Sequence, residues 1–229
     1  MHAEHTPAGH AHAGHTPAGH AHDHETAPEF TEEFWEERYS GSHQHVWSGR
    51  PNATLVTEAA GLPPGRALDI GCGEGADAVW LAEQGWDATA IDWSATALER
   101  AAAHDPGGRV HWLRADLATW APDEPFDLVT SHYTHPPADS RAELFARLAG
   151  MVAPGGTLLI VGHHPSDLDT SAGRPAVPDL LYTPEDILER LPVDGWDVVT
   201  AEARSRSTQD HDGNEITIHD SVVRARRSP

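Results

Sequence analysis

The sequence predicts an α/β fold in which a mostly parallel sheet of seven strands ends in an antiparallel C-terminal hairpin, with helices on both faces. Short apolar segments alternate with helix-like segments between residues 66 and 191. Two strand-like segments, 196–204 and 215–226, then flank a loop containing Asp212-Gly213. A glycine-rich turn separates the first strand from the first helix of the core, as in nucleotide-binding βαβ units.

A histidine-rich tail occupies residues 1–28. His5-Thr-Pro-Ala-Gly-His-Ala-His12 recurs as His15-Thr-Pro-Ala-Gly-His-Ala-His22, and apolar residues larger than alanine are nearly absent. Such a segment is predicted to be disordered. Clustered imidazoles bind Ni²⁺, Zn²⁺ or Cu²⁺, and a codon-repeat expansion without a selected function is the alternative. The candidate metal ligands are His5, His10, His12, His15, His20 and His22.

The next region, residues 29–61, is predicted to form an N-terminal cap of two helices, 29–39 and 52–60. Thr31 can start the first helix, and Ser40-Gly41-Ser42 ends it. Phe34, Trp35 and Arg38 fall near one face of this helix. The loop between the helices carries Trp47 and Arg50, which are candidates for a lid over a site.

The core is predicted to extend over residues 62–229. Its parallel strands are 66–70, 87–91, 110–113, 126–130 and 152–161, and its helices are 76–84, 94–103, 139–151 and 183–191. Ser94 and Thr183 have the N-cap residue types, and Pro184 fits a first helical turn. The proline-rich segment 166–182 is expected to pass over the mouth of the site.

The glycine turn fits two cofactor patterns. Gly71, Gly73 and Ala76 satisfy the dinucleotide pattern G-x-G-x-x-G/A. Gly71, Gly73 and Gly75 also follow Asp69 in an acidic-x-G-x-G-x-G pattern. A carboxylate at this position repels a pyrophosphate but suits a ligand with an ammonium and a sulfonium. The second pattern therefore favours a methionine-type nucleotide.

Asp92 supports a nucleotide site. It ends the second strand, 21 residues after Gly71, which is the spacing at which an acidic residue accepts hydrogen bonds from ribose hydroxyls. Trp93 follows and can pack on an adenine, although a core position at the helix entry is an equal alternative.

With Asp69 and Asp92, the turn resembles motif I of the class I S-adenosylmethionine (SAM)-dependent methyltransferases. The Pro154-Gly-Gly156 turn before a strand and the C-terminal hairpin match that family. Phe34-Trp-Glu-Glu-Arg-Tyr39, followed by Trp47-Ser-Gly-Arg-Pro51, looks like the cap of the thiopurine, tellurite-resistance and halide/thiol methyltransferases. The resemblance covers about residues 30–227.

This resemblance implies a Rossmann-like methyltransferase domain over residues 29–229, with SAM as cofactor and S-adenosylhomocysteine as product. It places Asp116 near the adenine amine, Leu117 and Ser131 beside the cofactor, and the cap over cofactor and acceptor.

Four histidines follow two strands that should be neighbours, at the strand ends where open α/β sheets bind ligands. His132, His163 and His164 are candidates for a general base, and His135 is a candidate acceptor contact. Two or three of them could instead hold a metal, or simply cap strands.

The composition restricts partners and location. The net charge is −21, which disfavours nucleic acids and anionic membranes. All 15 basic residues are arginine, so P-loop lysine and Schiff-base chemistry are excluded. A single cysteine, Cys72, and the lack of a signal or membrane segment predict a cytoplasmic location. We expect the protein to be a monomer or homodimer and to act on a small-molecule substrate.

The sequence thus predicts a SAM-dependent methyltransferase that acts on a small molecule through sulfur, oxygen, nitrogen or a chalcogen. The alternatives are a nicotinamide-dependent oxidoreductase and a metal-binding protein with a methyltransferase-like fold.

Overall fold

The computed structural model describes residues 31–229 apart from 43, 137, 173–176 and 193. The predicted histidine-rich tail and its candidate metal ligands lie outside the described residues. Within the described part of the chain, no helix has the length and apolar character needed to cross a membrane.

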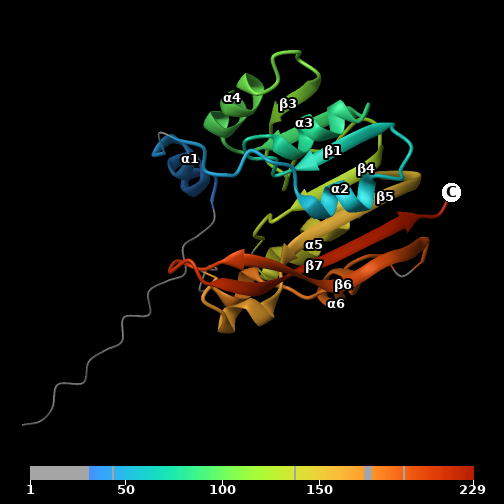
Figure 1. The fold of residues 1–229 in the computed structure, drawn as a ribbon. Helices are drawn as coiled ribbons and strands as arrows, with labels where there is room; N and C mark the ends of the chain where they lie inside the picture. Colours follow the sequence, from blue (N-terminus) through green and yellow to red (C-terminus); the bar gives the residue numbers. More distant parts are fainter. Residues whose placement is uncertain (1–30, 43, 137, 173–176, 193) are drawn as a thin grey trace, which may run out of the picture.

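A seven-stranded sheet forms the centre of the domain (Figure 1). The strand order is β3-β2-β1-β4-β5-β7-β6, and only β7 runs antiparallel to its neighbours. The strands are β1 (Arg66–Ile70), β2 (Asp87–Asp92), β3 (Val110–Arg114), β4 (Phe126–His132), β5 (Val152–His163), β6 (Trp196–Gln209) and β7 (Glu215–Arg227). The predicted parallel sheet with a C-terminal hairpin is confirmed.

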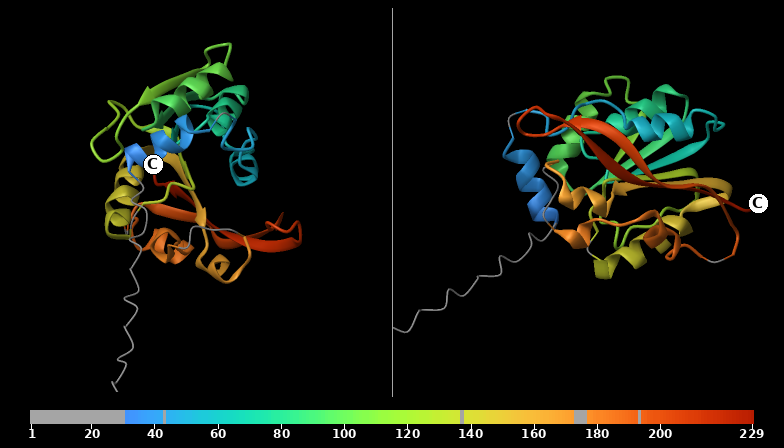
Figure 2. Two further views of the ribbon diagram at one scale, coloured as in Figure 1. Left: turned by 90° about the vertical axis from the view of Figure 1, so that its left-hand side faces the viewer. Right: turned by 60° about the horizontal axis from the view of Figure 1, so that its bottom comes forward.

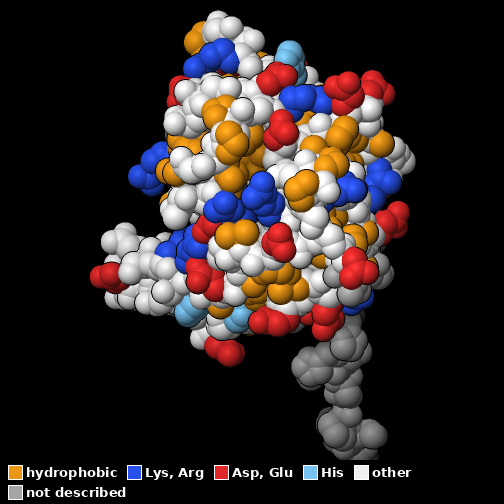
Figure 3. Space-filling view, turned by 90° about the vertical axis from the view of Figure 1, so that its right-hand side faces the viewer, with side chains coloured by type: hydrophobic (Ala, Val, Ile, Leu, Met, Phe, Trp, Pro, Cys, Tyr) orange, Lys and Arg blue, Asp and Glu red, His pale blue; other side chains and the backbone are white. Residues whose placement is uncertain are grey.

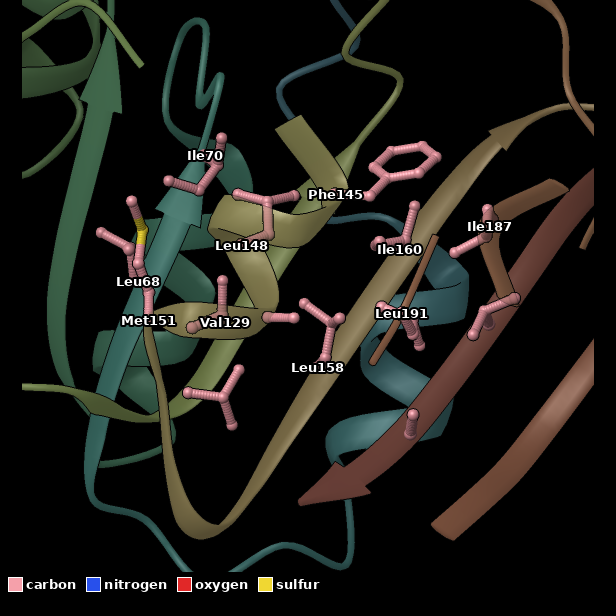
Figure 4. Packing of buried hydrophobic residues seen from close by; sticks show 14 of the residues in the cluster. Leu68, Ile70, Val129, Phe145, Leu148, Met151, Leu158, Ile160, Ile187 and Leu191 are labelled. Carbon is pink, nitrogen blue, oxygen red and sulfur yellow. The ribbon is translucent and has the colours of Figure 1, made fainter. Parts of the chain in front are cut away.

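Helices cover both faces of this sheet because the central strands are apolar on both sides. On one face, Phe145 and Leu148 of α5 and Ile187 of α6 pack with Leu68, Val129 and Leu158 (Figure 4). On the other face, Leu55 of α2 and Leu81 of α3 pack with alternate residues of the same strands. The helices of these layers are α2 (Ala53–Ala59), α3 (Ala76–Glu83), α4 (Ala95–Ala103), α5 (Ala138–Gly150) and α6 (Pro184–Leu188).

The first helix, α1 (Glu32–Ser40), lies outside both layers. It is found at the end of the sheet where the parallel strands finish, beside α4 (Figure 2, left). Thr31 caps it by accepting a hydrogen bond from the Phe34 N–H, as predicted. Two short 3₁₀ helices, Pro165–Asp169 and Pro178–Leu180, follow β5.

Some predicted bounds were wrong. The helix predicted over 183–191 ends at Leu188, because Arg190 and Leu191 donate to carbonyls three residues back, in tighter 3₁₀-type bonds. Strands β4 and β5 extend further than predicted, so Ser131, His132 and His163 are strand residues rather than loop residues. Their side-chain directions are therefore set by the pleat of the sheet.

β1 and β4 are spatial neighbours although β2 and β3 lie between them in the chain. The strand order reverses there, and ligands of open α/β sheets bind outside the carboxyl ends at such a reversal. The opposite end of the sheet faces the viewer in Figure 3, where arginine, acidic and hydrophobic side chains are interspersed.

Candidate active site

The glycine turn connects β1 to α3 at this reversal. Gly71, Gly73 and Gly75 all have positive φ, with values of 67°, 53° and 82°. At Gly73 a Cβ would lie 2.8 Å from Tyr39 Oη and 3.2 Å from Trp47 Nε1, so the cap requires a glycine there. At Gly75 a Cβ would collide with Trp112 and with Ala101 at 2.8 Å, so core packing requires this glycine.

The N-terminus of α3 is open. Gly75 occupies its N-cap position and provides no side-chain hydrogen bond. The first N–H groups of the helix therefore have no capping partner from this residue, and they point out of the glycine turn.

Three titratable side chains meet behind the turn. Asp69 on β1 and His132 on β4 face the side of the sheet covered by α3, because side chains alternate along neighbouring parallel strands. Asp77 lies in the first turn of α3. Its Oδ2 lies 2.7 Å from His132 Nδ1, and its Oδ1 accepts a hydrogen bond from the Asn52 N–H at 2.6 Å.

This group, Asp69–Asp77–His132, is largely shielded from solvent, with Asp69 buried and the Asp77 side chain 17% exposed. The side chain of His132 is 5% exposed, and its Nε2 has no hydrogen-bond partner among the described residues. Asp69 is 3% exposed; its Oδ1 accepts from the Thr130 hydroxyl at 3.1 Å, whereas its Oδ2 has no partner in the described part of the chain. One buried and one partly buried carboxylate with one imidazole form a site that favours a positively charged ligand group.

Burial and the nearby carboxylates change the protonation of these groups. Burial, reinforced by the Asp77 carboxylate, raises the pKa of Asp69. Burial alone would lower the pKa of His132, but the Asp77 carboxylate raises it above its ordinary value. Burial and Asp69 also raise the pKa of the Cys72 thiol, which therefore stays protonated and is a poor nucleophile.

Asp69, Asp77 and His132 each offer a ligand atom within 4.8 Å of the others, and they are the one such group found among the described residues. Both oxygens of Asp77 are already engaged, one by His132 and the other by Asn52. The unsatisfied atoms, Asp69 Oδ2 and His132 Nε2, fit an organic cation and its polar substituents at least as well as a metal.

Asp92 lies at the end of β2, where the sequence predicted a ribose acceptor. Its Oδ2 accepts from the Gly73 N–H at 2.8 Å, and its Oδ1 accepts from the Ser94 N–H at 2.9 Å. Each carboxylate oxygen has a further lone pair for a ligand hydroxyl. Trp93 extends toward the next loop, where its Nε1 donates to Asp116 at 3.3 Å.

An ion pair between the buried Glu74 and the partly exposed Arg100 attaches the cap over the glycine turn. Glu74, with a side chain 4% exposed, accepts from the Val46 and Trp47 N–H groups and pairs with Arg100 at 2.9 Å. Arg100 also donates to carbonyls of the cap, including that of Tyr39 at 2.8 Å. Glu36 on α1 completes the attachment by accepting from Ser94 and Thr96 at the start of α4.

A row of ring side chains runs from the cap to the end of β5. Trp35 stacks on His135 with ring centroids 6.2 Å apart, His135 lies 5.3 Å from His163, and His163 stacks on Tyr133 at 4.5 Å. We call these four side chains the ring row. Tyr133 adopts a left-handed backbone with φ of 52°.

Asp220 on β7 anchors the far end of the ring row. It accepts from the Tyr133 hydroxyl at 2.9 Å and from Arg206 at 2.7 Å. Burial would raise the pKa of Asp220, but contacts from His163 and Arg206 lower it to about 2.

The structure separates the four histidines predicted from the sequence. His135 and His163 belong to the ring row, and His132 pairs with Asp77. His164 instead caps the 3₁₀ helix that follows β5, where its Nδ1 accepts from the Ser166 N–H at 3.2 Å.

The other predicted site residues have varied positions. Trp47 lies over the turn and donates to Tyr39 Oη at 2.9 Å, whereas Arg50 is exposed. The hydroxyl of Ser131 lies 2.7 Å from that of Thr134, and Thr134 covers Gly71. Leu117 packs against the core on the α5 side, and Asp116 accepts from the Ala118 N–H at 2.8 Å.

Sequence reasoning missed several residues of this site. In the sequence, Asp77 has the pattern of an ordinary acidic residue in the first turn of α3. Glu74 occupies a position of the glycine turn that the motif leaves unspecified. Asp220 lies on a strand of the C-terminal hairpin, almost 90 residues from its partner Tyr133. Asp220 lies inside β7 rather than at a strand end, and nothing local in the sequence marks Glu74, Asp77 or Asp220.

Comparison with known proteins agrees with this geometry. Residues 67–156 match the methyltransferase domain family. Trans-aconitate 2-methyltransferase of Streptomyces coelicolor is 36% identical over 134 residues, which are 55% of this chain and 43% of that protein. Thiocyanate methyltransferase 1 of Brassica oleracea is 29% identical over 197 residues, covering 82% of this chain and 84% of that protein.

A solved structure that concerns the conversion of a disulfide bond into a thioacetal group during echinomycin biosynthesis has a similar fold. Its TM-score is 0.71 at 22% identity, with 86% of this chain and 91% of that chain covered. The match to the trans-aconitate enzyme, by contrast, spans less than half of that relative's length.

The sheet order and the acidic glycine turn define a Rossmann-like domain of the methyltransferase type. The family match over residues 67–156 and the similarity to curated methyltransferases support a class I SAM-dependent methyltransferase family for this chain.

Proposed function

We propose that this protein transfers a methyl group from SAM to a small-molecule acceptor. The observation that carries the proposal is the buried Asp69–Asp77–His132 group directly behind the glycine turn, with one unsatisfied carboxylate oxygen. A cofactor with an ammonium and a sulfonium supplies the positive charge that this group favours. A dinucleotide pyrophosphate would be repelled, so no observation supports the nicotinamide alternative.

Different residues around the turn would bind different parts of the cofactor. Asp69 would accept from the ammonium group, and Asp92 from the two ribose hydroxyls. The open N-terminus of α3 suits the carboxylate of the amino-acid part. Trp93 and Asp116, joined by a hydrogen bond, would border the adenine, with Leu117 and Ser131 nearby.

When bound, SAM supplies a methyl group that is already activated for in-line displacement. The protein must then position the acceptor, exclude water and accept a proton if the acceptor carries one. The cap, through Trp47 and Tyr39, would shield the turn from solvent. The ring row offers flat apolar surfaces against which a small acceptor can be oriented.

His132 is the base that we favour. Its Nδ1 is held by Asp77, so a neutral ring carries its hydrogen on Nδ1 and leaves Nε2 free to take a proton. His163 is the second candidate, since it belongs to the ring row. His164 is the weakest of the three, because its Nδ1 is used in capping the following helix.

Cofactor binding tests the proposal most directly. Isothermal titration calorimetry should detect S-adenosylhomocysteine at micromolar affinity or better, about −8 kcal/mol, and far weaker binding of NAD. Tight binding of NAD without heat from S-adenosylhomocysteine would refute the assignment.

Replacing Asp92 by alanine should weaken the binding of S-adenosylhomocysteine by roughly 2–3 kcal/mol, the scale of hydrogen bonds to a charged group. The variant should remain folded, because the carboxylate bonds only turn and helix-entry N–H groups. An unchanged dissociation constant would show that the ribose lies elsewhere.

The acceptor atom is to be found by a screen with labelled SAM. Small thiols, phenols, halides and chalcogen oxyanions cover the chemistry that this family resemblance implies. Activity that requires His132 only for acceptors protonated at neutral pH would support its role as a base.

A further inference from the structure

Arg38 on α1 is an exposed residue of the cap whose guanidinium lies over the indole rings of Trp35 and Trp47. No carboxylate among the described residues forms an ion pair with it, although the chain has 36 acidic and 15 basic residues. Three other arginines at this end of the domain are paired: Arg100 with Glu74, Arg114 with Glu32 and Arg206 with Asp220. Arg50 in the cap loop is exposed and, like Arg38, forms no ion pair among the described residues.

The position of Arg38 in the helix explains this. Helical ion pairs form three or four residues apart, and the residues at those distances before Arg38 are Trp35 and Phe34. The glutamates of α1 lie on other sides of the helix: Glu32 pairs with Arg114, and Glu36 binds Ser94 and Thr96. Within the described part of the chain, no ion pair therefore neutralises the Arg38 charge.

Two indole rings hold the guanidinium in place. Its central carbon lies 5.5 Å from the centroid of Trp47 and 6.0 Å from that of Trp35. Arginine stacked on aromatic rings still presents the N–H groups of its planar edge, in the fork that matches a carboxylate. The cap thus contains an exposed guanidinium that lies over two indole rings.

Both indoles belong to the site. Trp47 covers Gly73 of the glycine turn, and Trp35 begins the ring row that continues to His135 and His163. A ligand lying along the ring row would therefore have flat aromatic surfaces beside it and the Arg38 guanidinium at its cap end.

We propose that Arg38, placed by Trp35 and Trp47, selects an acceptor that carries a carboxylate beside a flat apolar body. The inference rests on the proposed function, since it assigns the ring row to the acceptor. The carboxylate is held by Arg38, and the methylated atom is a separate group of the same molecule. Because the protein has a net negative charge, a local arginine is needed to attract an anionic acceptor.

Binding of benzoate and benzamide to the S-adenosylhomocysteine-loaded protein tests the inference by calorimetry. The two probes have the same shape and differ in charge. Benzoate should bind more tightly than benzamide to the wild type. Arg38→Gln should lower the affinity for benzoate about tenfold, which is the lower range for hydrogen bonds to a charged group. The affinity for benzamide should stay unchanged. Arg38→Lys should be intermediate, because an ammonium lacks the fork.

Arg66→Gln is the matched control. Arg66 also lies over an aromatic ring, 4.6 Å from the centroid of Phe126, but at the start of β1, the opposite end of the sheet. It should leave both probes unaffected.

S-adenosylhomocysteine is titrated first into every variant, so the two hypotheses fail separately. No binding of S-adenosylhomocysteine to the wild type would overturn the proposed function. If S-adenosylhomocysteine binds normally, three results would overturn the anion subsite alone. These are equal affinities for benzoate and benzamide, no benzoate binding at millimolar concentrations, and an unchanged benzoate affinity in Arg38→Gln.

Discussion

At the scale of single residues, the site depends on buried polar atoms whose partners come from distant parts of the chain. Asp77 is the clearest case: it joins His132, 55 residues away, to the cap through the Asn52 N–H. An aspartate that both fixes the tautomer of a histidine and raises its pKa is a positioning residue. Its effect should therefore appear in the pH dependence of the reaction as well as in its rate.

Replacing Asp77 by asparagine should move the acid limb of the pH–rate profile to lower pH. His132 must be neutral to accept a proton, so the wild-type rate should rise through a pKa above the ordinary value of about 6.5. Without the carboxylate, burial dominates and the pKa falls. The plateau rate should drop roughly 10–100-fold, because the remaining ring is a weaker base. Stopped-assay rates with a protonated acceptor, measured between mildly acid and mildly alkaline pH, provide the profile.

Asp220→Asn serves as the comparison for that experiment, because Asp220 lies beside His163 rather than His132. A shift of the acid limb in this variant, with none in Asp77→Asn, would assign the base to His163 and contradict our choice.

At the scale of elements, the cap and the core meet through polar contacts more than through apolar packing. Of the residues of α1, only Tyr39 is buried. Arg100 and Glu74 together bind backbone groups of five cap residues, those of Tyr39, Ser42, Gln44, Val46 and Trp47. A segment attached in this way can open locally while the sheet stays intact.

Arg100→Gln should therefore loosen the cap without unfolding the core. Loss of an arginine that binds a buried glutamate and several carbonyls should cost about 2 kcal/mol, mainly in the local opening of residues 32–47. Hydrogen exchange followed by mass spectrometry should show faster exchange there and unchanged exchange in β1, β4 and β5. Arg109→Gln is the control, because Arg109 pairs with Asp105 and Glu83 on the other side of α4. Uniformly faster exchange over the whole chain would show that the cap is part of the core.

At the scale of the whole molecule, the described domain accounts for the proposed reaction without the histidine-rich tail. Each residue to which we assign a role in the cofactor or acceptor site lies between positions 35 and 220. The tail holds eight of the 18 histidines of the chain, so metal binding and methyl transfer are expected to be separable.

Deleting residues 2–24 should leave kcat/KM for methyl transfer unchanged and remove most Ni²⁺ or Zn²⁺ that survives dialysis. Clustered neutral imidazoles are the reason for the second expectation. Metal content by mass spectrometry and rates from the same preparation are the two measurements. A truncated protein that binds S-adenosylhomocysteine normally but has lost its activity would place the tail in the acceptor site.

The sequence by itself determined the order of the elements, the sheet type and the glycine turn with Asp69 and Asp92. These features depend on local patterns, such as apolar periodicity, capping residues and glycines with positive φ, which act over a few positions. The same patterns placed four histidines at strand ends, and three of them lie at the site.

Only the tertiary structure decided which polar groups meet. The pairs Asp77–His132, Glu74–Arg100 and Asp220–Tyr133 join elements that are far apart in the chain, and their distances depend on strand register and on where the cap packs. The structure also showed that neighbouring histidines have different surroundings. The pleat of the sheet turns His163 toward the ring row, while His164 caps the next helix. Register and packing angle are properties of the assembled sheet, and no local sequence pattern encodes them.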